Sequence, residues 1–139
     1  MTQAATQKDA LFTSGFSTFA VKDIGEAMRF YGETLGLDVS ETNEGMNLGI
    51  PGGGHVFVYP KGDHEPAVFT VFNLKVNDID QAVDELSIRG ITFLQYGEPI
   101  KTDEKGIFRG SKDGNGPNIA WFNDTSGNII SIIESSIGR

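Results

Sequence analysis

The stretch FSTFAVKDIGEAMRFYGETLGLDV (residues 16–39) decides the fold, because the chain repeats its pattern 55 residues later. The second copy reads VFNLKVNDIDQAVDELSIRGITFL (residues 71–94). It lacks one residue after its helical part, so that Gly90 corresponds to Gly36. A stack of small repeats needs at least about three copies to bury a core. Two copies therefore indicate a duplicated module rather than a solenoid. The identical pairs are Val21 and Val76, Asp23 and Asp78, Ile24 and Ile79, and Ala27 and Ala82.

Each copy is predicted to open with a β-strand. Phe19 and Val21 stand two residues apart in the first copy, and Phe72, Leu74 and Val76 do so in the second. Apolar residues at this spacing lie on one face of an extended chain. We expect that face of both strands to pack against helices.

A helix is predicted directly after each strand. Asp23 and Asp78 stand where a helix would begin. Glu26 and Gln81 follow three residues later, which is the pattern of a capping box. Apolar residues then recur at helical spacing. The glycine shared by both copies is expected to end the helix, as a C-terminal cap.

Three further strands are predicted after each helix, so that each copy reads strand–helix–strand–strand–strand. The segment from Lys101 to Asn118 interrupts the second copy with glycines and charged residues. A loop of that length in a compact domain is a functional lid or a disordered insert, and both remain open. The predicted strands are LDVSET (37–42), MNLGI (46–50) and HVFVY (55–59) in the first copy, and ITFLQY (91–96), NIAWF (118–122) and NIISIIE (128–134) in the second.

The duplication also sets the expected domain organisation. A chain of 139 residues is long enough for one ordinary domain with a core of its own. The expected parts are an N-terminal arm (1–15), a single domain (16–135) made of module one (16–66) and module two (67–135), and a C-terminal tail (136–139).

Composition restricts the function. The net charge of −8 argues against nucleic acid as a partner, because phosphate binding needs clustered lysine and arginine. The chain has no cysteine, which excludes disulfides, thiol nucleophiles and cysteine metal sites. Neither a signal peptide nor an apolar run of about 20 residues is present. We therefore expect a cytoplasmic protein without a membrane partner.

Three segments resemble the vicinal oxygen chelate superfamily, the glyoxalase and bleomycin-resistance group. They are VKDIGEAMRFYGETLGL (21–37), VNDIDQAVDEL with RGITF (76–93), and AWFNDTSGNIISIIE (120–134). The resemblance implies an α+β fold in which two paired βαβββ modules form an open, curved, eight-stranded sheet. This sheet is a cup with the helices outside. The resemblance also implies a homodimer, and some members exchange N-terminal arms.

In metal-dependent members, the ligands are His, Glu or Gln from the first and last strand of each module. The matching positions here hold Phe16 and Val71 in the first strands and Ser131 in the last strand of module two. In the last strand of module one the candidates are residues 56–58, which are all apolar. We therefore expect no metal and no other cofactor. Whether any catalytic activity remains is left open.

The two histidines and the cations of the long segment have alternative roles. His55 opens the predicted strand 55–59 and would reach the cup if the register shifted, whereas His64 lies in the polar turn KGDHEP. Without inward carboxylates they make a weak metal site, so surface or structural roles are favoured. Lys105 and Arg109 would either cover an anionic ligand or remain solvated, and solvation is favoured.

Alternation predicts an apolar cup with a few polar anchors, which is the composition of a small-molecule site. We predict a metal-independent small-molecule-binding protein that takes an apolar or cationic ligand. One alternative is a superfamily lyase, isomerase or dioxygenase with a displaced metal site that uses His55. Another is an interaction module whose cup is filled by large side chains. Trp121 is expected opposite Ser131, and Lys75 lies on the same face as Val71 and Asn73. The predicted ligand-binding residues are Phe16, Thr18, Val71, Asn73, Trp121 and Ser131.

Overall fold

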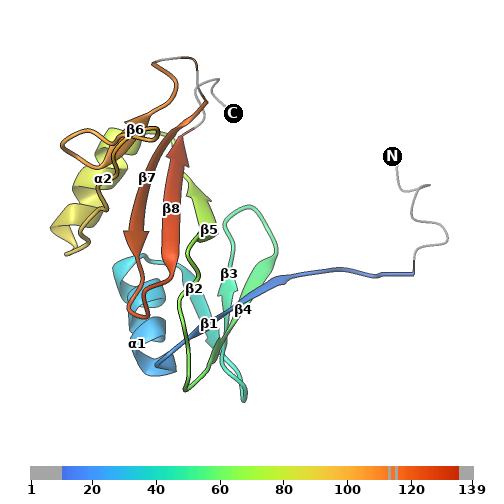
Figure 1. Cartoon of the computed structure of the whole chain (residues 1–139). Coiled ribbons are helices and arrows are strands. Elements are labelled where there is room, and N and C mark those ends of the chain that lie inside the picture. Colours follow the sequence, from blue (N-terminus) through green and yellow to red (C-terminus); the bar gives the residue numbers. More distant parts are fainter. Residues whose placement is uncertain (1–10, 113, 115, 135–139) are drawn as a thin grey trace.

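The computed structural model describes residues 11–112, 114 and 116–134. Over this part of the chain the strands form two four-stranded sheets, ordered β1-β4-β3-β2 and β5-β8-β7-β6 (Figure 1). The elements are β1 (Ser17–Val21), α1 (Ile24–Arg29), the π-helix η2 (Phe30–Thr34), β2 (Asp38–Glu41), β3 (Met46–Gly49), β4 (His55–Pro60), β5 (Thr70–Lys75), α2 (Ile79–Ile88), β6 (Ile107–Arg109), β7 (Asn118–Asn123) and β8 (Ile129–Glu134).

The two sheets repeat one topology, as the duplication predicts. β1 runs parallel to β4 and β5 runs parallel to β8, while the other neighbours are antiparallel. The predicted α+β fold of two βαβββ modules is therefore confirmed. β1 and β5 are edge strands of their sheets. Their modules meet where the rings of Phe19 and Phe72 lie 6.4 Å apart.

Both helices begin at the predicted aspartates. The side chains of Asp23 and Asp78 accept hydrogen bonds from the backbone N–H groups three residues later, at 2.9 and 3.1 Å. Gly36 has a φ of 78° and Gly90 a φ of 99°, which is the left-handed conformation that ends a helix. The first helix differs from the prediction in one respect, because α1 continues from Phe30 as the π-helix η2.

The predicted strand over residues 91–96 is wrong. Ile91 and Phe93 are buried, as the alternation requires. The segment nevertheless joins β7 through the hydrogen bond from Leu94 N to Trp121 O without entering the sheet ladder. Instead, β6 pairs with the free edge of β7. This strand lies within the segment that was predicted to be a lid or a disordered insert. The alternation of apolar and polar residues predicts which side chains are buried, but it does not predict which segment pairs with a given strand.

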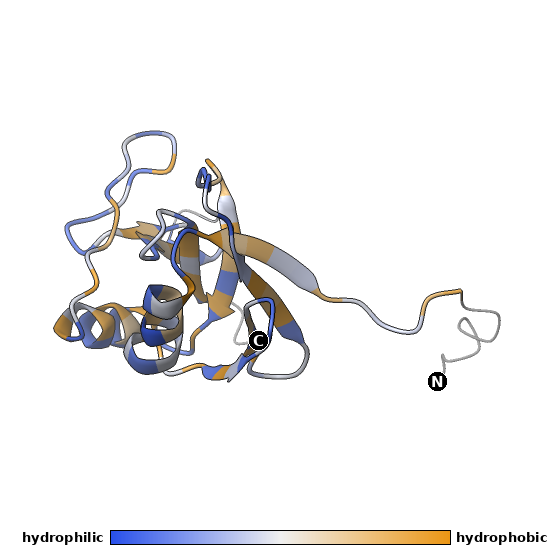
Figure 2. Cartoon of the chain, turned by 90° about the horizontal axis from the view of Figure 1, so that it is seen from below, coloured by the Kyte–Doolittle hydropathy of each residue, from blue (hydrophilic) through white to orange (hydrophobic). Residues whose placement is uncertain are grey.

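One hydrophobic core joins the helix-facing sides of both sheets. Phe19, Val21 and Phe72 are buried in it, as predicted, and Leu74 and Val76 pack against its margin. In Figure 2 the strands carry much of the hydrophobic colour, and the helices alternate between hydrophobic and hydrophilic residues. Burial of this apolar surface is the main force that stabilises the fold. The opposite faces of the strands remain for other contacts.

The turn DTSG (124–127) fastens module two to module one. The buried carboxylate of Asp124 accepts hydrogen bonds from Tyr31 Oη at 2.7 Å, Asn128 N at 2.9 Å and Asn128 Nδ2 at 3.0 Å. Asn128 Nδ2 also donates to Ala20 O on β1, at 2.8 Å. Burial, and then the neighbouring carboxylate, raise the pKa of Tyr31 far above its ordinary value. Residues that carry the superfamily resemblance therefore hold the modules together.

Residues 11–16 precede β1 and extend away from the body of the molecule (Figure 1). Their apolar side chains Leu11 and Phe12 are 85% and 79% exposed. Residues 1–10 of the predicted arm and the predicted tail 136–139 lie outside the described residues. Within the described ranges, no helix is both long enough and apolar enough to cross a membrane.

Candidate functional site

Strand pairing identifies the fourth position that would hold a ligand in metal-dependent members of the superfamily that the sequence resembles. Ser131 on β8 pairs with the residue two places after Val71 on β5. In module one, Thr18 on β1, two places after Phe16, pairs with Phe57 on β4. Phe57 is therefore the counterpart of Ser131, and the choice among residues 56–58 is resolved.

The side chains at these four positions do not fit a metal site. Phe16, Phe57 and Val71 are hydrocarbon and have no lone pair to donate. Ser131 has no exposed surface, and its hydroxyl donates a hydrogen bond to Oδ1 of Asn73. Elsewhere in the described residues, no three His, Cys, Asp or Glu side chains gather closely enough to hold a metal ion. Protein sites for zinc and similar metals need several such ligands.

Three predicted ligand-binding residues lie side by side on the sheet β5-β8-β7-β6. Trp121 pairs with Ser131 across the β7–β8 hairpin, as predicted, and Asn73 pairs with Ser131 from β5. The ring of Trp121 meets Tyr96 edge to face, with centroids 5.2 Å apart. Asn73 is exposed whereas Ser131 is fully covered. Ser131 therefore holds the amide of Asn73 in place, and Asn73 presents it at the surface.

Phe16 lies apart from the other predicted residues. It is 61% exposed, and its ring stacks on His55 with centroids 4.8 Å apart. His55, Phe57 and Tyr59 alternate on the half-buried face of β4. His55 therefore shares the face of Phe57 without any shift of register. His55 therefore lies in the strand where a displaced metal site would need a ligand. Its stacking neighbour Phe16, however, has no lone pair with which to bind a metal.

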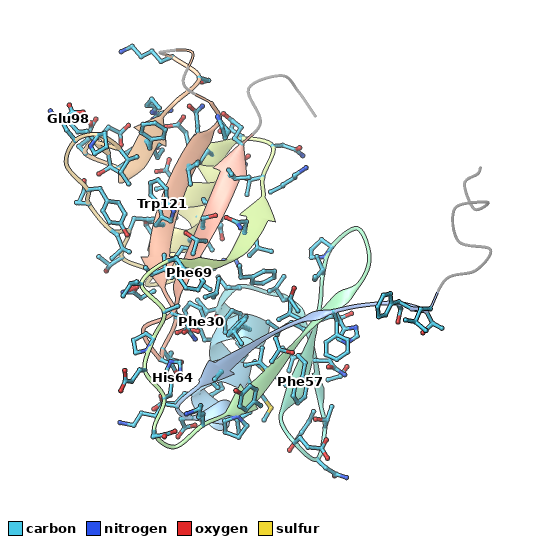
Figure 3. All side chains as sticks on the ribbon, turned by 45° about the vertical axis from the view of Figure 1, so that its right-hand side comes forward. Phe30, Phe57, His64, Phe69, Glu98 and Trp121 are labelled. Atoms are coloured by element: carbon cyan, nitrogen blue, oxygen red, sulfur yellow. The ribbon has the colours of Figure 1, made fainter. Side chains whose placement is uncertain are left out.

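A groove of about 640 Å³ lies between the edge strands β1 and β5. The linker that joins the modules, residues 61–69, contributes part of its wall. Of the predicted ligand-binding residues, Thr18 and Val71 line this groove. Figure 3 shows His64 and Phe69 on the linker, which leads from β4 of one sheet to β5 of the other. A groove of this volume suits a drug-sized molecule.

His64 and Phe69 are groove residues that the sequence patterns did not reveal. His64 was expected to be a surface or structural histidine, yet its Nε2 atom is buried and has no hydrogen-bond partner among the described residues. Phe69 lines the groove while 66% of it is exposed. Both lie in a linker without regular structure, so no periodicity could place them. The one sequence feature that pointed to this part of the linker was the apolar pair Val68 and Phe69 among polar residues.

Lys105 and Arg109 are bound to the start of α2. Arg109 contacts Asp80 at 2.8 Å and Asp103 at 2.9 Å, while Lys105 contacts Asp80 at 3.1 Å and Asp84 at 3.0 Å. Hydrogen bonds from Arg109 and Lys105 hold the pKa of Asp80 well below its usual range. The two cations therefore fasten the long segment to α2, and they are not free to cover an anionic ligand.

Comparison with known proteins agrees with this architecture. The sequence profile of the Glyoxalase/Bleomycin resistance protein/Dioxygenase superfamily matches residues 14–132. No curated protein matches the chain at a significant level.

Several solved structures share the fold. One is TnmS3, an antibiotic binding protein from Streptomyces sp. CB03234, with 22% identity, 89% of this chain and 98% of that chain covered, and a TM-score of 0.58. A superfamily member from Sphaerobacter thermophilus has 23% identity, coverage of 88% and 98%, and a TM-score of 0.60. FosX, a fosfomycin resistance protein from Listeria monocytogenes, has 11% identity, coverage of 91% and 96%, and a TM-score of 0.63.

At these identities the solved structures establish the fold and not the ligand. The profile match extends over most of the chain, and the duplicated βαβββ topology agrees with it. The chain therefore belongs to the Glyoxalase/Bleomycin resistance protein/Dioxygenase superfamily.

Proposed function

We propose that this chain is a metal-independent small-molecule-binding protein of the glyoxalase/bleomycin-resistance type. The observation that carries the proposal is the groove of about 640 Å³ between β1 and β5. Its wall is formed by five apolar residues and eight polar or charged ones, so it offers a small molecule both a surface for packing and groups for hydrogen bonding. An open groove of this size also favours binding over a cup filled by its own side chains.

The ligand is proposed to be an apolar or cationic small molecule. The net charge of −8 favours cations, and the apolar part of the wall favours a hydrocarbon or aromatic body. Thr18 and Val71 would contact the ligand from the groove, and Ser131 would act through Asn73. The other predicted contacts are Phe16 and Trp121.

Two of the similar structures support a role in handling foreign small molecules. TnmS3 is an antibiotic binding protein, and FosX is a fosfomycin resistance protein. Their likeness to this chain is one of fold, so they suggest a class of ligand to test first rather than a particular compound.

A thermal-shift screen of a broad library that includes cationic antibiotics tests the proposal. A ligand that binds only the folded state raises the melting temperature by mass action. The strongest compound should lose its effect in Thr18→Phe, which puts a ring into the groove. Ser40→Phe makes the same change at an exposed position of β2 and should keep the effect. A library that yields no stabilising compound would contradict the proposal.

A superfamily enzyme with a displaced metal site is the second candidate. The observation in its favour is His55, which shares the face of β4 with Phe57. Metal analysis of protein purified without chelators distinguishes the two candidates. Stoichiometric zinc, nickel, iron or manganese that disappears in His55→Phe would favour the enzyme, whereas the binding proposal expects none.

We also propose that the protein is a cytoplasmic homodimer. Its exposed apolar residues include Leu11, Phe12, Val68 and Phe69. The first two lie on the N-terminal segment and the last two on the linker, and exposed apolar surface often marks protein contacts. Sedimentation of the full chain should give the mass of two copies, and a chain that lacks residues 1–15 should shift toward one copy. A full chain that sediments as a single copy would contradict the proposed assembly.

A further inference from the structure

A second recess lies on the helix side of the sheets, away from the groove. It has a volume of about 250 Å³ and lies where module one meets β5 and α2 of module two. Module one contributes Leu35, Leu37 and Pro51, and module two contributes the other lining residues. The recess and the groove share no residue. A molecule in the recess would therefore bridge the two modules at a place separate from the proposed binding site.

The wall of this recess is almost entirely apolar. Nine of its eleven lining residues have apolar side chains. The two others, Lys75 and Glu85, are exposed, so water can solvate their charges. The backbone N–H groups of Leu35, Leu37 and Val76 already donate to carbonyl groups of the chain. A ligand in the recess must therefore gain its affinity from packing rather than from hydrogen bonds.

Most of the apolar wall can be reached from solvent. The recess extends inward to the core at Phe122 and Ile132, which are buried. Apolar surface that stays in contact with water after folding keeps an unfavourable hydration free energy, which an apolar ligand would relieve. Six apolar residues line the recess and are only partly buried, namely Leu35, Leu37, Leu74, Val76, Ala82 and Leu86.

The volume of the recess limits the size of the ligand. An apolar cavity of about 150 Å³ is large enough to hold benzene. Sites for drug-sized molecules usually have about 300–1,000 Å³. The recess, at about 250 Å³, lies between these values. It therefore suits a molecule of two fused rings, or roughly ten carbon atoms.

We infer that this recess is a second binding site, which takes a small neutral hydrocarbon or aromatic molecule of about ten carbon atoms. The inference does not rest on the proposed function. The ligand packs against the two leucines that follow η2 and against the side chains of β5 and α2. Since both modules contact it, only the folded domain offers the complete site, and binding stabilises the fold by mass action.

A matched pair of probes tests the chemistry of the site. Naphthalene is a hydrocarbon, and 1,5-naphthyridine has the same shape with one nitrogen in each ring. Each is titrated into full-length protein with ¹³C-labelled methyl groups, and contacts between ring protons and the methyl groups of Leu35, Leu74 and Leu86 locate it. We expect naphthalene to bind with a Kd of order 0.1 mM. The naphthyridine should bind at least about tenfold more weakly, because one of its nitrogens loses a hydrogen bond to water.

Substitutions on α2 then assign the binding to the recess. Ala82→Phe puts a ring into it and should weaken naphthalene binding at least about tenfold. The added ring fills the recess rather than displacing core side chains, so the melting temperature should not fall. Ser87→Phe makes a similar change at an exposed position of α2 outside the recess and should bind naphthalene as the parent protein does. Ala82→Val takes up less of the space and should weaken binding about threefold, which provides a test if Ala82→Phe does not fold.

Three results would overturn the inference. If naphthalene contacts none of the three leucines, or binds Ala82→Val and Ala82→Phe as tightly as the parent protein, the recess is not its site. If 1,5-naphthyridine binds as tightly as naphthalene, the ligand class is wrong. If naphthalene binds only after Leu11→Ser and Phe12→Ser are introduced together, the exposed N-terminal segment occupies the recess, and the small-molecule site is wrong.

Discussion

At the scale of single residues, Asp124 shows how one buried carboxylate can hold two modules together. It lies in the β7–β8 turn and accepts a hydrogen bond from Tyr31 in η2. Asn128 extends the contact to the backbone of β1. A buried carboxylate is tolerated only when its oxygens are hydrogen-bonded, so each donor to Asp124 contributes to the junction.

We predict that Tyr31→Phe lowers the free energy of unfolding by about 1.5–3 kcal/mol, because it removes a donor from a buried charged acceptor. Denaturant unfolding at neutral pH measures the change. Tyr59→Phe removes the same hydroxyl from a half-buried ring on β4 and should change stability by less than about 0.5 kcal/mol. Equal effects in the two variants would contradict the role of the Tyr31–Asp124 contact.

The same residue predicts a loss of stability in alkali. The unfolded chain ionises its tyrosines near about pH 10, whereas the raised pKa of Tyr31 keeps its proton in the folded state. The unfolded state therefore binds fewer protons above that pH. Tyr31 should then cost the fold about 1.4 kcal/mol per pH unit. Tyr31→Phe should show a shallower fall between about pH 10 and 11, and an unchanged slope would contradict the assignment.

At the scale of elements, the edge of β7 shows what alternation leaves undecided. Residues 91–96 have the burial pattern of a strand, but β6 takes the place beside Asn118–Ala120. β6 is held there by Asp103, which accepts hydrogen bonds from Ile107 N at 2.9 Å and Arg109 Nε at 2.9 Å. Side-chain hydrogen bonds and ion pairs hold β6 beside β7, and such contacts produce no periodic pattern in the sequence.

We predict that Arg109→Gln loosens β6 without unfolding the domain. The ion pairs are partly exposed, so the global cost should stay below about 1 kcal/mol. Amide hydrogen exchange at residues 107–109 should accelerate. The variant lacks the ion pairs to Asp80 and Asp103, so local opening of β6 costs less free energy. Lys101→Gln, which changes an exposed cation nearby, should leave exchange at these amides as it is. The same protection in both variants would contradict the role of Arg109.

At the scale of the whole molecule, the sequence duplication predicted the fold but only part of the candidate site. The matched aspartates and glycines of the two copies were enough to predict both modules, because each residue has a local role in its own helix. Trp121 was correctly expected opposite Ser131, since a short hairpin sets the register. The groove was not foreseen. It depends on how two edge strands approach each other, and on where an irregular linker carries His64 and Phe69.

The central claim is that a small molecule binds in the groove between β1 and β5 without a metal. Amide shift mapping on chelator-treated protein, with the strongest stabilising compound of the screen, tests it most directly. The account predicts shifts concentrated in residues 17–20 and 61–71, with the same affinity before and after chelation. Shifts confined to other surfaces, or binding that is lost on chelation and restored by zinc or iron, would contradict it.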